Sequence, residues 1–157
     1  MKWIIFLILN TFYSSYAIAD SIVTIHPAWF KYLQDAYTNT DATILFTLKE
    51  INVIPSEDDD PGWHTVKKVG KIKKVYNSNE KFDGDIFEFI TTIETNPEFD
   101  QSQLPQDYIV NLCFEGDRWT GGGFGTFNQA NPDLTAAIKK ISQTVKITSE
   151  DKRIWCQ

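Results

Sequence analysis

The sequence predicts a mainly β fold: a small barrel of about five antiparallel strands, with one helix before the barrel and one after it. Residues 42–127 contain several segments in which apolar and polar residues alternate, and this two-residue period is typical of strands. Apolar residues at helical spacing occur on either side, within residues 27–38 and 131–141. A slip in the alternation and several glycines would let the strands bend and close on themselves.

The first helix is expected from residue 27 to about residue 38. Proline suits the first turn of a helix, so His26-Pro27 can start it. The apolar residues that then recur at helical spacing are Trp29, Leu33, Ala36 and Tyr37.

Two strands and a loop are expected next. The alternation over residues 42–54 predicts a strand, and its slip by one position at Glu50-Ile51 predicts a β-bulge. Residues 55–62 form a polar loop between prolines. Residues 66–76 carry apolar residues at every third position, which a helix could explain, but the β-branched residues and Gly70 favour a strand with a bulge or coil at the glycine.

The third and fourth strands follow a turn signal at Asp83-Gly84. Residues 85–95 are rich in strand-forming residues, and those expected on one face are Phe87, Phe89, Thr91 and Ile93. After a polar loop over residues 96–107, residues 108–115 predict a strand with Cys113 on one face. The opposite face would carry Tyr108, Val110, Leu112 and Phe114.

The last part of the region predicts a short strand and a helix. Residues 121–127 form a glycine-rich connection that runs into the short strand. Asn131 is a good N-cap, Pro132 suits the first helical position, and Asp133 complements the positive end of the helix dipole. The apolar stripe that follows is Leu134, Ala137, Ile138 and Ile141.

In this order of elements, the stretch from residue 42 to residue 141 resembles the netrin-like and tissue-inhibitor-of-metalloproteinases group of OB-type barrels. The segments that carry the resemblance are ATILFTLKEI, VGKIKKVYNSNEKFDGDIFEF, DYIVNLCFEG with the later GGGF, and the LTAAIKKI helix. The resemblance implies an OB-like barrel and a protein-binding role. In the inhibitor family a cysteine at the mature N-terminus chelates the protease zinc, whereas the mature chain expected here begins Asp20-Ser21, so no binding residue carries over.

Residues 1–19 are expected to be a cleaved secretory signal, which leaves residues 20–157 as a single domain. Lys2 gives a positive start, an apolar run covers residues 3–9, and Ala17-Ile18-Ala19 places small residues where a signal peptidase cuts. The apolar run is too short to span a bilayer, which needs about 20 apolar residues, so no stable membrane insertion is expected after cleavage.

Charge and cysteine content agree with export. Without Lys2, 14 Lys and Arg residues stand against 21 Asp and Glu residues, a net charge of −7 that argues against binding nucleic acid. Cys113 and Cys156 are the only cysteines, and an oxidising compartment would join them in a disulfide. No Asn-x-Ser/Thr acceptor occurs, which favours a bacterial, periplasmic location over an extracellular eukaryotic one.

The best candidate for an interaction surface is an aromatic and basic cluster near a connection between strands. Its members are Arg118, Trp119, Phe124 and Phe127, although core packing would explain Phe124 and Phe127 equally well. The acidic loop Glu57–Asp60 is more simply a solvated loop than a Ca²⁺ site. A second charged group is expected to be the wet face of a strand rather than a basic binding patch, and it comprises Lys67, Lys68, Lys71, Lys73 and Lys74.

No catalytic or metal-binding constellation is identified, and no cofactor is expected. His26 and His64 lie far apart in the sequence, and the pairs Asp83/Asp85 and Glu115/Asp117 carry no sign of acid–base asymmetry. The favoured function is a small exported binding or inhibitory module with a protein partner. The alternatives are a periplasmic immunity-type protein that neutralises a toxin, and an envelope enzyme whose site is assembled from distant residues.

Overall fold

The computed structural model describes residues 25–55, 63–94, 104–121, 126–147 and 154–156 of the 157-residue chain. The expected signal segment and its cleavage site lie outside the described residues, as do the acidic loop Glu57–Asp60 and Phe124.

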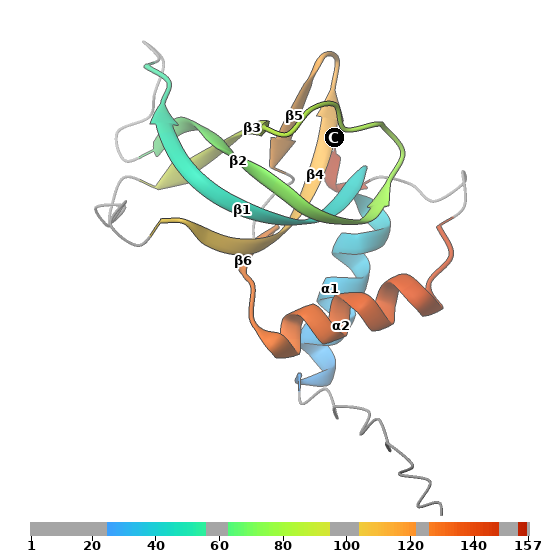
Figure 1. The fold of residues 1–157 in the computed structure, drawn as a ribbon. Helices are drawn as coiled ribbons and strands as arrows, with labels where there is room; N and C mark the ends of the chain where they lie inside the picture. The colour runs from blue at the N-terminus through green and yellow to red at the C-terminus, as the bar shows by residue number, and fades with distance from the viewer. Residues whose placement is uncertain (1–24, 56–62, 95–103, 122–125, 148–153, 157) are drawn as a thin grey trace, which may run out of the picture.

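The described part of the chain forms a closed, OB-like barrel with two helices packed beneath it (Figure 1). The barrel strands are β1 (Ala42–Val53), β2 (Trp63–Ser78), β3 (Phe87–Glu94), β4 (Gln106–Glu115) and β5 (Arg118–Gly121). They follow one another around the barrel in the order β1-β2-β3-β5-β4, and β4 pairs back with β1. The short strand β6 (Phe127–Gln129) adds to β4, so the predicted fold class is confirmed.

Two details of the sheet differ from the prediction. The pairing of β3 with β5 is parallel, whereas the other strand pairs are antiparallel. Arg118 and Trp119 open strand β5, whereas the sequence predicts a connection between strands near them. This strand has only four residues, too few for alternation to stand out in the sequence.

Both predicted helices are confirmed, with their caps. Helix α1 (Pro27–Asn39) begins after His26, whose Nδ1 accepts a hydrogen bond from the backbone N–H of Ala28 (3.2 Å). Helix α2 (Pro132–Thr144) begins after Asn131, whose Oδ1 accepts from the N–H of Leu134 (2.8 Å). A short 3₁₀ helix, η2 (Ile154–Cys156), follows beside the barrel.

Two hydrophobic clusters hold these layers together. The first fills the barrel with side chains from its strands and includes Ile44, Phe46, Phe89, Val110 and Leu112. The second joins the helices to the outer face of the barrel and comprises Leu33, Tyr37, Ile109, Leu134, Ala137, Ile138 and Ile141. Alternate residues of β4 thus serve opposite clusters, as the two-residue period requires.

The bulge predicted in β1 is present and lies opposite Gly70 of β2, where β2 itself has no extra residue. The β1–β2 register shifts between Leu48 and Glu50, next to Gly70 on β2. A side chain at Gly70 would collide with the carbonyl oxygen of Thr47 and would lie 2.7 Å from the ring of Phe46. Glycine is therefore needed here because the strands approach too closely for a Cβ atom.

The predicted disulfide is present between Cys113 of β4 and Cys156 of η2, with a Cα–Cα distance of 5.3 Å. It fastens η2 to the barrel at the end of β4 (Figure 1). Among the described residues, no helix has the length and apolar character needed to cross a membrane.

One lysine of the group expected on a wet strand face is buried instead. Lys68 is only 4% exposed, whereas Lys71, Lys73 and Lys74 are exposed. The strand period places Lys68 on the same face as the buried Val66 and Gly70, so its side chain enters the barrel. The ammonium nitrogen lies 3.4 Å from the ring centroid of Phe127.

Candidate functional site

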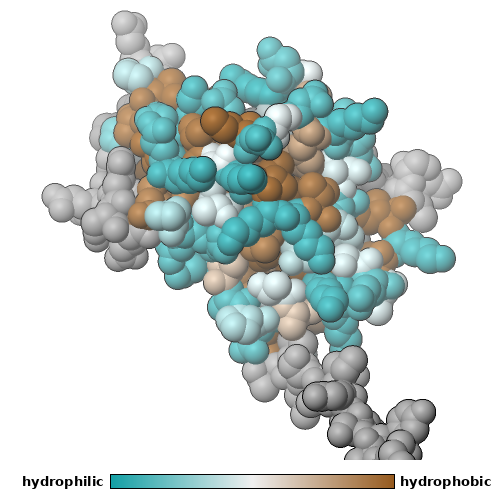
Figure 2. All heavy atoms as spheres, viewed as in Figure 1, coloured by the Kyte–Doolittle hydropathy of each residue, from teal (hydrophilic) through white to brown (hydrophobic). Residues whose placement is uncertain are grey.

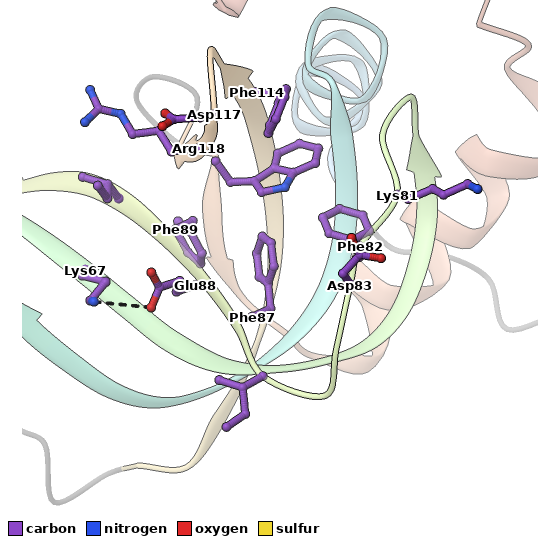
Figure 3. Close-up of a pocket in the computed structure, with 13 residues that line it drawn as sticks. Lys67, Lys81, Phe82, Asp83, Phe87, Glu88, Phe89, Phe114, Asp117 and Arg118 are labelled. Carbon is purple, nitrogen blue, oxygen red and sulfur yellow. Dashed lines mark ion pairs between the residues drawn. The ribbon is translucent and has the colours of Figure 1, made fainter.

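A pocket of about 390 Å³ opens at one end of the barrel, beside the turn between β4 and β5 (Figure 3). Its walls come from the first half of β3, the β4–β5 hairpin and the connection between β2 and β3. We call it the Trp119 pocket; the residues that define it here are Phe82, Ile86, Phe87, Phe114 and Trp119.

The pocket forms between β3 and β5, whose pairing is the shortest of the barrel among the described residues. Within the ranges that the structure describes, β3 and β5 share one bridge, Ile90 with Thr120. By contrast, β4 and β5 share four residue pairs, and β2 and β3 share eight. Because β3 and β5 are not paired before this bridge, aromatic side chains line the space between them.

The inner wall of the pocket is aromatic. The rings of Trp119 and Phe82 are stacked, with centroids 4.8 Å apart and planes 24° apart. Phe82 also meets Phe87 edge to face at 5.1 Å, and Phe114 lies 5.1 Å from Trp119. These contacts fix the rings relative to one another and leave a preformed apolar surface.

Apolar side chains also reach the rim. Ile86 is 71% exposed and Phe114 is 37% exposed, whereas Trp119 at 9% belongs to the inner wall. On the face of the molecule shown in Figure 2, apolar residues are exposed between hydrophilic ones. The pocket therefore combines a buried aromatic wall with an exposed apolar edge, which is the composition of a binding surface.

Charged groups of both signs surround the opening. Lys67 pairs with Glu88, with 3.4 Å between Nζ and Oε2. Within the described part of the chain, Asp83, Asp117 and Arg118 form no ion pair. Figure 3 shows the side chains of Lys81 and Arg118 directed away from the aromatic rings.

Two glycines shape the turns around the pocket. Gly116, with φ of +69°, turns the chain from β4 into β5, and the N–H of Asp117 donates to the carbonyl oxygen of Glu115 (2.9 Å). Gly84, with φ of +83°, lies at the predicted turn ahead of β3. Both glycines adopt left-handed backbone conformations, which other residues rarely adopt.

A buried carboxylate supports the hairpin from behind. Asp41 is 3% exposed, and its Oδ2 accepts a hydrogen bond from the backbone N–H of Phe114 (2.8 Å). The N–H of Asp41 donates to the carbonyl oxygen of Leu112 (2.8 Å). Asp41 therefore fixes the strand end that carries Phe114 into the pocket.

The structure separates the residues proposed from sequence as an interaction surface. Arg118 and Trp119 line the Trp119 pocket. Phe127 does not, because it lies on β6 and stacks on Tyr108 with centroids 4.0 Å apart. The part of these residues in binding stays a prediction.

Sequence reasoning did not find Phe82, Ile86 or the role of Phe114 in this pocket. Phe82 stands in a polar connection, and its contact with Trp119 depends on how the barrel closes. Ile86 could have indicated an exposed apolar site. It follows the turn signal closely, and the two-residue period of β3 places it on the face opposite the buried Phe87 and Phe89.

The buried lysine of the barrel and the one group of potential metal ligands both lie outside the Trp119 pocket. Burial lowers the pKa of Lys68 to about 8, but this amine lies against Phe127 inside the barrel. Among the described residues, the one group of potential metal ligands joins Asp41 to Cys113 and Cys156. The two sulfur atoms are bonded to each other, so neither is a thiolate ligand.

No protein-family model matches the chain, and a search of curated proteins finds no significant match.

Proposed function

We propose that the protein is an exported binding or inhibitory module that holds a protein partner against the Trp119 pocket. The observation that carries the proposal is the exposed apolar edge of Ile86 and Phe114 beside a fixed aromatic wall. Interfaces are enriched in aromatic side chains and arginine, and Arg118 stands at the same opening.

The filled barrel also supports a surface role. Its interior is occupied by packed side chains, so a ligand inside the barrel would have to displace the core. The Trp119 pocket, by contrast, is open between β3 and the β4–β5 hairpin.

Export is part of the same proposal. The signal-like residues 1–19 and the disulfide between Cys113 and Cys156 support a periplasmic or other extracytoplasmic location. Membership of the netrin-like and tissue-inhibitor group also stays a proposal, supported by the OB-like barrel and the flanking helices.

The test is capture of a partner by the mature domain from envelope extract, followed by identification of the bound protein. Ile86→Asp should abolish capture, because a charge would stand on the apolar edge. Val53→Asp is the matched control: Val53 is a 57% exposed apolar residue on β1 and does not line the pocket. Equal loss with both variants, or capture that neither variant affects, would contradict the proposal.

A further inference from the structure

The Trp119 pocket combines aromatic rings with carboxylates, and both can bind a cation; three basic side chains, Lys67, Lys81 and Arg118, also line it. Aromatic ring faces attract cations through their quadrupoles, and four rings line the pocket: Phe114 is 37% exposed and Phe82 is half-buried, whereas Trp119 and Phe87 form the inner wall. Carboxylates can add charge-assisted hydrogen bonds to such a cation. Asp83 and Asp117 supply carboxylates on opposite sides of the pocket (Figure 3).

The basic side chains around the opening do not occupy the aromatic rings or the two carboxylates, so an external cation can contact them. Lys67 is engaged by Glu88 at 3.4 Å. Lys81 and Arg118 are directed away from the aromatic rings in Figure 3. Asp83 and Asp117 form no ion pair within the described ranges, so each carboxylate is available to a ligand.

We propose that the Trp119 pocket receives an arginine side chain from an exposed loop of a basic protein partner. This inference rests on the proposed function and names the chemistry of the partner. The planar guanidinium stacks on aromatic rings and forks onto carboxylates, which a lysine ammonium does less well. The net charge of −6 for the chain attracts a basic partner before contact.

The first experiment uses N-acetyl-arginine amide as the probe in an NMR titration of the oxidised mature domain. Saturable shifts are expected at the Trp119 indole N–H and at the amides of residues 82–88 and 114–119. The citrulline amide keeps the shape but lacks the charge, and we expect it to bind about ten-fold more weakly, or about 1.4 kcal/mol. The norleucine amide tests whether the pocket accepts an apolar side chain instead.

Variants of the two carboxylates make the test specific. Asp83→Asn and Asp117→Asn remove one charge each from exposed positions, and each should weaken arginine amide binding about three-fold. Glu50→Gln, an exposed substitution on β1, is the control and should leave binding unchanged. Equal binding of the three amides, shifts outside the pocket, or no saturable shift would overturn the arginine proposal.

The captured partner separates this inference from the proposed function. If Ile86→Asp abolishes capture while the Asp83→Asn/Asp117→Asn double variant retains it fully, the binding function stands and the arginine proposal falls. If the double variant also loses capture and the partner is basic, both are supported. If no partner is captured by the wild-type domain, the proposed function falls, and the arginine proposal falls with it.

Discussion

Replacing Lys68 with methionine should stabilise the protein at neutral pH. Lys68 is 4% exposed, and among the described residues no carboxylate pairs with its ammonium. Burial lowers its pKa from 10.5 to about 8, which corresponds to about 3 kcal/mol of lost folding stability. The contact with Phe127 returns about 1 kcal/mol, so Lys68→Met should gain about 2 kcal/mol.

The same reasoning fixes the pH dependence. Below pH 8 the amine is protonated in both the folded and the unfolded chain, so folding bears the whole cost of burying the charge. As pH rises from 8 towards 10.5, the folded chain loses this proton first, so wild-type stability increases. Lys68→Met should lack this increase, and its advantage over the wild type should shrink across the same range.

Urea unfolding of the oxidised domain at steps between pH 6.5 and about 9.5 measures both effects. The upper limit stays below the titration of the tyrosines whose pKa burial raises, namely Tyr32, Tyr37, Tyr76 and Tyr108. Lys71→Met, on the exposed face of β2, is the control and should change stability little. A wild type and a Lys68→Met variant with the same pH profile would refute the reasoning.

Three further predictions concern single features of the fold, each measured by urea unfolding. Gly70→Ala should destabilise by about 3 kcal/mol, because the new Cβ would collide with the Thr47 carbonyl; an unchanged midpoint would contradict the close approach. Asn131→Ala should cost about 1 kcal/mol through the lost cap of α2, with Asn131→Asp as a variant that retains it. The Cys113→Ser/Cys156→Ser double variant should lose about 4 kcal/mol, and reductant should lower the wild type similarly but leave the variant unaffected.

The parts of the fold that local chemistry determines were predictable from sequence. Asn131 and Pro132 define the start of α2 through a cap and a permitted first position, and the structure shows both in these places. The slip at Glu50 predicted a register shift because alternation itself records which face is buried.

The sequence-based predictions failed in two situations. In one, the apolar residues of a segment fit both a two-residue and a three-residue spacing; in the other, a contact forms only when the barrel closes. The prediction for Lys68 is wrong: the apolar residues of its segment recur every third position, and this hides the two-residue period that buries the lysine. The contact of Phe82 with Trp119 joins a connection to a four-residue strand that follows β4, and only closure of the barrel brings them together. No local pattern encodes a contact of that kind.

Among the described residues, β3 and β5 share only the bridge between Ile90 and Thr120, so the pocket lies where the described barrel has the fewest strand-pairing hydrogen bonds. Backbone opening requires less free energy where fewer hydrogen bonds must break, so β3 and β5 can separate while β1, β2 and β4 stay paired. A bound side chain could then increase the separation of β3 and β5 without disturbing the packed interior of the barrel. The short described pairing of β3 with β5 would thus let this face adapt to the proposed ligand.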